Sequence, residues 1–245
     1  MAEPGKFLFD GKPTPFQPGQ TIIEAAAEAG HYIPHLCYRP EFPPHGSCKL
    51  CSVRANCRFT SACFEPVTEG MKVDSETPEI LGYRKRVVQM LFAEGNHYCA
   101  FCEKSGDCEL QAVAYYLGME DTHYAHQYPQ RQLDASHPDA LIDHDRCILC
   151  ELCVRASRDV DHKEVFGVAG RGMHARLVVN SVSGKLGDST FAISDAAASV
   201  CPVGAILPKR KAFETPIGQR RYDQHDIGEE AGRLTTEDKS GAQSK

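Results

Sequence analysis

The chain has 245 residues, of which 42% are hydrophobic and 24% charged, a composition typical of a folded globular protein. Its formal net charge of −6 lacks the basic excess of nucleic-acid-binding surfaces, so we expect no nucleic-acid partner. The first ten residues contain no secretory apolar run, and no stretch is long and apolar enough to span a membrane. We therefore expect a cytoplasmic protein whose twelve cysteines bind metal or carry redox chemistry, because structural disulfides are rare there.

The first 35 residues predict a small α/β unit. Short strands near 7–9 and 14–17 flank an Asp10-Gly11 turn. Thr21 and Glu24 form a capping box that begins a helix, and Gly30 ends that helix. With a closing strand at 71–73, this order of elements predicts a β-grasp ferredoxin domain over residues 1–77, in a protein of the α+β class.

The first cysteine group contains Cys37, Cys48, Cys51 and Cys63. Its spacing approaches the plant-type [2Fe–2S] pattern C-x4-C-x2-C…C, although the first gap is longer here. Zinc is the competing ligand, but zinc sites usually combine two CxxC pairs, and this group has one pair with single distant partners. We predict a [2Fe–2S] cluster on these four residues, with Cys57, in an expected hairpin turn, as a bystander.

Residues 78–126 predict a small helical domain. Thr77-Pro78 begins a helix and Gly95 ends it, with Val88 on the apolar face and Arg84 expected on the opposite, solvent-facing side. A further helix is expected from Asp107 to Tyr116, followed by a long connector over residues 118–138.

The second cysteine group lies in this helical domain and has three thiols, on Cys99, Cys102 and Cys108. A [4Fe–4S] cluster needs a fourth ligand, and imidazole can replace thiolate on iron. His97, two residues before Cys99, is therefore the expected fourth ligand. His123 and His126 on the connector are the next candidates and enter only if His97 does not bind.

The third cysteine group is the most specific: Cys147, Cys150 and Cys153, followed much later by Cys201-Pro202. Two-cluster bacterial ferredoxins carry the run C-x2-C-x2-C-x3-C-P, in which the fourth cysteine binds the other cluster. In that register the positions of the other cluster are occupied by Ser157, Phe191, Ser194 and Ala197. We therefore predict a ferredoxin-like domain over residues 138–210 that keeps one [4Fe–4S] cluster on the four cysteines.

The rest of the second half gives weaker signals. Two β-rich runs flank Ser181–Asp188 and predict a hairpin inserted in the ferredoxin-like domain, while the glycines of Gly167–Gly172 predict a turn. Residues 211–245 form a polar C-terminal extension, expected to be a docking segment or a disordered tail.

Eleven cysteines and His97 make twelve ligands, which suffice for one [2Fe–2S] and two [4Fe–4S] clusters. No phosphate-binding, flavin, nicotinamide or catalytic-triad pattern accompanies them. We therefore expect a chain that carries electrons without a catalytic residue, a flavin or NAD of its own. The alternative from another class is a zinc-stabilised interaction scaffold.

The chain resembles the small diaphorase subunit, of the gamma or U type, of cytosolic NAD-reducing nickel–iron hydrogenases. It is also similar to the N-terminal iron–sulfur part of the large iron–sulfur subunit of respiratory complex I. The complex I subunit has its histidine four residues before the first cysteine, where this chain has Gly95, and continues into a molybdopterin-type domain. The first difference makes the fourth ligand rest on His97, and the second, that this chain stops soon after the third cysteine group, favours the hydrogenase family. The resemblance is carried by CYRPEFPPHGSCKLC, SACFEPVTEG, FAEGNHYCAFCEKSGDCELQAVAYYL, DRCILCELCVRASRDV and CPVGAILPKR…PIGQRRYD.

This resemblance implies an electron-relay subunit of a hydrogen:NAD+ oxidoreductase. It implies an FMN- and NAD-binding diaphorase subunit on one side and the small and large nickel–iron hydrogenase subunits on the other. A relay subunit of an NAD-dependent formate dehydrogenase, or of a complex I-like dehydrogenase, is the alternative within the redox class.

Overall fold

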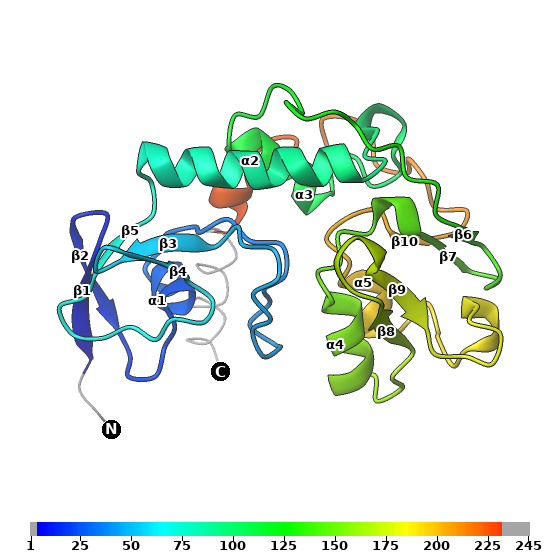
Figure 1. Cartoon of the computed structure of the whole chain (residues 1–245), viewed down its shortest axis with the longest axis horizontal. Helices are drawn as coiled ribbons and strands as arrows, with labels where there is room; N and C mark the ends of the chain where they lie inside the picture. The colour runs from blue at the N-terminus through cyan, green and yellow to red at the C-terminus, as the bar shows by residue number, and fades with distance from the viewer. Residues whose placement is uncertain (1–3, 232–245) are drawn as a thin grey trace.

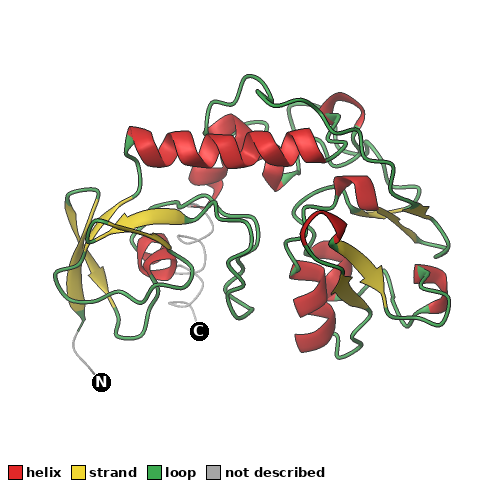
Figure 2. Ribbon diagram, in the orientation of Figure 1, coloured by secondary structure: helices red, strands yellow, loops and turns green. Residues whose placement is uncertain are grey.

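The computed structural model describes residues 4–231, which form an N-terminal α/β unit, a helical layer and a C-terminal α/β unit (Figure 1). Figure 2 shows that the strands gather at the two ends of the molecule, while a long helix crosses from the first unit toward the second. The N-terminal unit contains β1 (Gly5–Phe9), β2 (Lys12–Phe16), α1 (Ile22–Glu28), β3 (Ser52–Ala55), β4 (Arg58–Ser61) and β5 (Lys72–Asp74).

The N-terminal strands form one mixed sheet in the order β2-β1-β5-β3-β4, in which β1 and β5 run parallel and the other pairs antiparallel. The strands predicted near 7–9 and 14–17, and the closing strand, are confirmed. The helix start is also as predicted, because the Thr21 N–H donates to the Glu24 carboxylate at 2.8 Å. Phe7, Ile22 and Val53 are buried in the core between α1 and the sheet, which leaves the thiol loops at its margin.

The helical layer consists of α2 (Pro78–Glu94) and α3 (Glu109–Tyr116). The Thr77 hydroxyl accepts from the Ile80 N–H at 3.4 Å, and Gly95 caps the other end, as predicted. The expected exposure of Arg84 is wrong, since this side chain is only 1% exposed. Ile80, Arg84 and Val88 are spaced four residues apart and therefore share the buried stripe of the helix. Arg84 can occupy that stripe because backbone carbonyl oxygens accept its hydrogen bonds.

The C-terminal unit has a three-stranded sheet of order β10-β7-β6 and a separate β8–β9 hairpin. Its elements are β6 (Leu133–Asp134), β7 (Ala140–Asp143), α4 (Leu152–Asp159), β8 (Phe166–Ala169), β9 (Arg176–Val179), α5 (Ala196–Ser199) and β10 (Ile206–Pro208). The predicted hairpin around Ser181–Asp188 is wrong. Residues 189–193 form no strand, and β9 pairs instead with β8, the strand that precedes it in the chain. The glycines between β8 and β9 explain the difference, because Gly170 and Gly172 have positive φ angles suited to the turn.

The C-terminal extension folds back onto the chain over its last described residues. The Tyr222 N–H donates to the Gly106 carbonyl oxygen at 2.9 Å, and Ile227 is buried with Val88 of α2. The disordered tail is wrong for this part, because an apolar side chain anchors it in the core, and the docking role stays a prediction. The extension beyond residue 231 lies outside the described residues. Among the helices described, none is long and apolar enough to cross a membrane.

Candidate metal centres

The first thiol group lies at the margin of the N-terminal sheet. Cys37 follows α1, Cys48 and Cys51 lie in the loop before β3, and Cys63 follows β4. The four thiols meet as two pairs: the Sγ atoms of Cys37 and Cys48 are 3.4 Å apart, and those of Cys51 and Cys63 are also 3.4 Å apart. Cys57 is exposed in the β3–β4 turn and belongs to neither pair.

The electrostatics of the first group favour a thiolate in each pair. The Cys48 thiol hydrogen-bonds to Cys37 and lowers the pKa of Cys37 to about 4. Likewise, hydrogen bonding from the Cys51 thiol lowers the pKa of Cys63. Thiolate is the form of cysteine that binds metal, and two thiol pairs match the needs of two iron atoms. The residues present therefore fit a [2Fe–2S] cluster.

The second thiol group is formed around the start of α3. Cys99 begins a short 3-10 turn, Cys102 follows it and Cys108 is the N-cap of α3. Burial and the neighbouring Cys102 raise the pKa of Cys99, while burial, Cys102 and Cys99 raise the pKa of Cys108 to about 12. The mutual influence shows that the three thiols lie close together. Gly106, with φ of +84°, provides the turn that carries the chain from Cys102 to Cys108.

His97, two residues before Cys99, has an unpartnered ring nitrogen. Its Nε2 atom is buried and has no hydrogen-bond partner, while its ring lies tilted against Phe92 at 5.4 Å between centroids. Burial, together with Arg146 and His126, lowers the pKa of His97 to about 4, so the imidazole is neutral at pH 7. A neutral imidazole nitrogen is a metal ligand, and a buried one without a partner is costly unless it binds something. These features fit a ligand role, although the His97 residue meets Cys99 through its carbonyl oxygen, 3.8 Å from Cys99 Sγ.

The two alternative histidines are placed differently. The Nε2 atom of His126 lies 3.0 Å from the Gly95 carbonyl oxygen, so this nitrogen already has a partner. His123 is exposed on the connector. Neither shares the unpartnered, buried nitrogen of His97.

The third thiol group lines one cavity in the C-terminal unit. Cys147, Cys150 and Cys201 surround it with Cys153 at the start of α4, among apolar side chains such as Ile206. Burial raises the pKa of Cys147 to about 11 and raises the pKa values of Cys150 and Cys153 as well. In a dry pocket of this kind the thiols lose their protons when a metal binds, so metal binding and deprotonation are coupled.

The four positions that would bind a second ferredoxin cluster carry side chains that pack or lie exposed instead. Ser157 is buried, and its hydroxyl accepts from the Val165 N–H at 2.8 Å. Phe191 and Ala197 lie in the same apolar core as Phe166, and Ser194 is exposed. Apolar side chains therefore occupy space that a cluster would need.

The third group contacts both of the other two. The Arg155 guanidinium donates to the carbonyl oxygens of both Cys37 and Cys150, which joins it to the first group. The Glu109 N–H donates to the Pro202 carbonyl oxygen at 2.9 Å, and these residues directly follow Cys108 and Cys201. This places the third group beside the second.

Glycine allows a further close approach between the second and third groups. A Cβ atom added to Gly204 would lie 3.1 Å from Cys102 Sγ, a tight contact, so glycine lets the chain after Cys201 pass Cys102 without displacing it. Arg146 spans the same boundary, with Nη1 3.6 Å from Cys102 Sγ and 3.5 Å from the Gly204 carbonyl oxygen.

Sequence reasoning missed three arginines at these sites: Arg84, Arg146 and Arg155. The spacing of Arg84 on the buried stripe of α2 was a usable signal, as was the position of Arg155 two residues after Cys153. The partners of Arg146 and Arg155 come from distant segments, so no local pattern identifies them.

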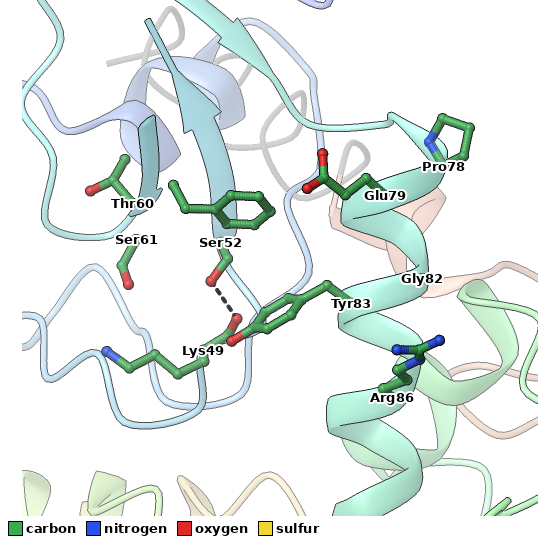
Figure 3. A pocket seen from close by; sticks show the side chains of 10 residues that line it. Lys49, Ser52, Thr60, Ser61, Pro78, Glu79, Gly82, Tyr83 and Arg86 are labelled. Carbon is green, nitrogen blue, oxygen red and sulfur yellow. Dashed lines mark hydrogen bonds between the residues drawn. The ribbon is translucent and has the colours of Figure 1, made fainter. Parts of the chain in front are cut away.

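A groove of about 790 Å³ opens beside the first thiol group, between β4 and α2 (Figure 3). Its lining includes Ser52 and Ser61, which are one and two residues from Cys51 and Cys63. Phe59 and Tyr83 both line it, with ring centroids 5.9 Å apart. The lining contains no cysteine, so the groove adjoins the first thiol group without being part of it.

Within residues 4–231, no group of three His, Cys, Asp or Glu side chains is placed so that it could hold a single metal ion.

Three family descriptions match successive parts of the chain. A "2Fe-2S iron-sulfur cluster binding domain" matches residues 2–78, and a "4Fe-4S single cluster domain" matches residues 141–207. Between them, residues 84–123 match the "NADH-ubiquinone oxidoreductase-G iron-sulfur binding region". The chain therefore contains iron–sulfur domains of both cluster types.

Several proteins are similar along most of the chain. The gamma subunit of the NAD-reducing hydrogenase HoxS of Cupriavidus necator is 38% identical over 237 residues, which cover 96% of this chain and 99% of that protein. A chain in the crystal structure of an NAD+-reducing nickel–iron hydrogenase in the H2-reduced state is 50% identical, with a TM-score of 0.89 and coverage of 93% of this chain and 98% of that one.

The G-type subunit of the NADH-quinone oxidoreductase of Rickettsia prowazekii is 30% identical over 85% of this chain, which spans only 31% of that protein. The relationship to complex I is thus real but partial, whereas the match to the hydrogenase protein runs over both chains almost entirely. This protein belongs to the family of gamma subunits of NAD-reducing hydrogenases.

Proposed function

We propose that this chain is the electron-relay iron–sulfur subunit of a cytoplasmic hydrogen:NAD+ oxidoreductase. It passes electrons between the nickel–iron hydrogenase subunits and a diaphorase subunit that binds FMN and NAD. One observation carries the proposal: three separate thiol groups are connected by direct contacts, through Arg155 and through the hydrogen bond of Glu109 with Pro202. The chain itself holds no catalytic residue in this proposal, because its role is to position carriers.

Three iron–sulfur domains account for these sites. A β-grasp [2Fe–2S] domain occupies residues 1–77, a helical [4Fe–4S] domain residues 78–126 and a ferredoxin-like [4Fe–4S] domain residues 138–210, with residues 211–245 as an extension. The mixed sheet with its parallel β1–β5 pair supports the first assignment, and the family matches support the cluster types.

Each domain holds one cluster in this proposal, and each cluster supplies one-electron transfer when bound. The ligands are Cys37, Cys48, Cys51 and Cys63 for the [2Fe–2S] cluster, His97, Cys99, Cys102 and Cys108 for one [4Fe–4S] cluster, and Cys147, Cys150, Cys153 and Cys201 for the other.

The order of the sites in space differs from their order in the chain. The third group contacts the first through Arg155 and the second through the segment after Cys201. We therefore propose that the third cluster connects the other two, and that those two face the partner subunits.

Metal analysis of the anaerobically purified complex tests the proposal. We expect about ten irons per chain, with matching acid-labile sulfide, because one two-iron and two four-iron clusters sum to that number. A flavin-containing subunit and nickel–iron hydrogenase subunits should co-purify. Zinc without iron would instead support the scaffold, and a formate dehydrogenase subunit in place of the hydrogenase would reassign the partner.

Replacing Cys57 and Cys63 separately by serine tests the assignment of the first site. Cys63→Ser should lose about two irons, because it removes one thiol of a pair. Cys57→Ser should keep the full iron content, because Cys57 is exposed in the β3–β4 turn. Iron and sulfide analysis of the two purified variants measures both. If only Cys57→Ser loses iron, Cys57 is the ligand and Cys63 the bystander.

A further inference from the structure

Within the described part of the chain, two arginines are buried without an acidic hydrogen-bond partner. Arg84 is 1% and Arg155 is 5% exposed. Arginine is almost never buried in proteins unless it is paired with an opposite charge. Among residues 4–231, however, the hydrogen-bond acceptors of both guanidinium groups are backbone carbonyl oxygens and one serine hydroxyl. Their positive charges therefore call for a compensating negative group.

Arg84 reaches the first thiol group from α2. Its Nε atom donates to the Leu50 carbonyl oxygen and its Nη2 atom to the Ser52 carbonyl oxygen, both at 2.9 Å. Leu50 and Ser52 flank Cys51, so the guanidinium holds the backbone on both sides of one thiol of the Cys51–Cys63 pair. Hydrogen bonds to the Ser75 carbonyl oxygen and hydroxyl use two further donors and fix the plane of the group.

Arg155 reaches the first thiol group from α4, on the other side. Its Nη2 atom donates to the Cys37 carbonyl oxygen at 2.5 Å and to the Cys150 carbonyl oxygen at 3.3 Å. Its Nη1 atom donates to the Pro43 carbonyl oxygen at 2.9 Å, and its guanidinium lies over the Phe42 ring at 5.7 Å. This cation is therefore shared between the Cys37–Cys48 pair and the third thiol group.

Each thiol pair of the first site thus has one buried guanidinium beside it. A cluster held by four thiolates is anionic and becomes more so on reduction, and a fixed cation in a low-dielectric surrounding stabilises the more negative state most. Water can offset such charge only weakly at buried positions, so the effect of the cation is not screened away.

We propose that Arg84 and Arg155 compensate the charge of the first cluster, one for each thiol pair, and raise its reduction potential. Arg155 also raises the potential of the third cluster, because it contacts Cys150. Both are positioning residues that act through the ligand backbone and through charge. This inference rests on the proposed function, since it requires iron–sulfur clusters at both sites.

The test uses the assembled complex, purified anaerobically, with Arg84→Gln, Arg84→Lys, Arg155→Gln and Arg155→Lys in this chain. Glutamine removes the charge and keeps a donor, whereas lysine keeps the charge and loses the planar fork. Arg58→Gln is the matched control, because Arg58 lies on β4 of the same domain but is exposed and paired with Glu65. Iron content and the midpoint potential of each cluster, from EPR-monitored redox titration, are the readouts.

Both glutamine variants should shift the midpoint potential of the [2Fe–2S] cluster to more negative values. The lysine variants keep the charge, so their midpoint potentials should lie close to that of the unmodified chain. Arg155→Gln should also lower the potential of the third cluster, and Arg84→Gln should leave that potential unchanged. Arg58→Gln should change neither. If a glutamine variant fails to retain iron, the iron content of the corresponding lysine variant is compared with that of the unmodified chain. Iron retained with lysine indicates a role for the charge, whereas a merely structural role predicts the same iron loss with lysine.

Unchanged potentials in iron-loaded glutamine variants would overturn this inference, as would iron loss in both the lysine and the glutamine variants. Neither result would affect the proposed function. That function fails separately, if the unmodified chain holds zinc in place of iron.

Discussion

Replacing His97 by alanine should leave an open iron site in the second cluster. The variant should show a three-iron EPR signal or lose that cluster, because the three thiols of Cys99, Cys102 and Cys108 then lack a fourth ligand. Electron flow between hydrogen and NAD+ should fall sharply, while the reactions of each end with artificial dyes continue. EPR of the reduced complex and the two dye assays measure these effects.

His97→Cys is the matched control for this experiment. It should keep a four-iron cluster, and its potential should fall, because thiolate adds a negative charge that disfavours the reduced state. If His97→Ala keeps both the EPR spectrum and the coupled activity, the fourth ligand lies elsewhere. The Nε2 atom of His97 would then lack a hydrogen bond only because its ring packs against Phe92.

Replacing Cys201 by alanine should also strongly reduce iron content and coupled electron transfer, because it removes a ligand of the third cluster, which connects the other two in our proposal. The variant should lose up to about four of about ten irons. Coupled transfer from hydrogen to NAD+ should collapse, since in our proposal electrons pass between the first and second clusters through the third. Iron analysis and the coupled assay, compared with the dye reactions at each end, measure the result.

Ser199→Ala is the control for Cys201→Ala. Ser199 lies two residues earlier, in α5, and is exposed, with its hydroxyl donating only to the Ala196 carbonyl oxygen at 3.2 Å. This variant should keep its iron and its coupled activity. Full iron content in Cys201→Ala would contradict the ligand set proposed for the third cluster.

Local patterns were sufficient for most elements of the fold. The capping box at Thr21, the Pro78 helix start and the Asp10-Gly11 turn each depend on neighbouring residues, and each is present in the structure. The inserted hairpin was misplaced, because strand pairing is decided between segments. Residues 189–193 are rich in strand-forming types, yet Phe191 is instead buried against Phe166.

Cysteine spacing by itself predicted the three groups of candidate ligands, because runs such as C-x2-C follow known cluster-binding patterns. It also predicted the loss of a second ferredoxin cluster, because the register of a ligand run is a property of the chain. Only the tertiary structure decided which thiols form pairs, how the three groups are ordered and where buried cations lie. Those features depend on contacts such as that of Arg155 with Cys37, 118 residues apart, which form because buried donors and acceptors must be satisfied within the folded core.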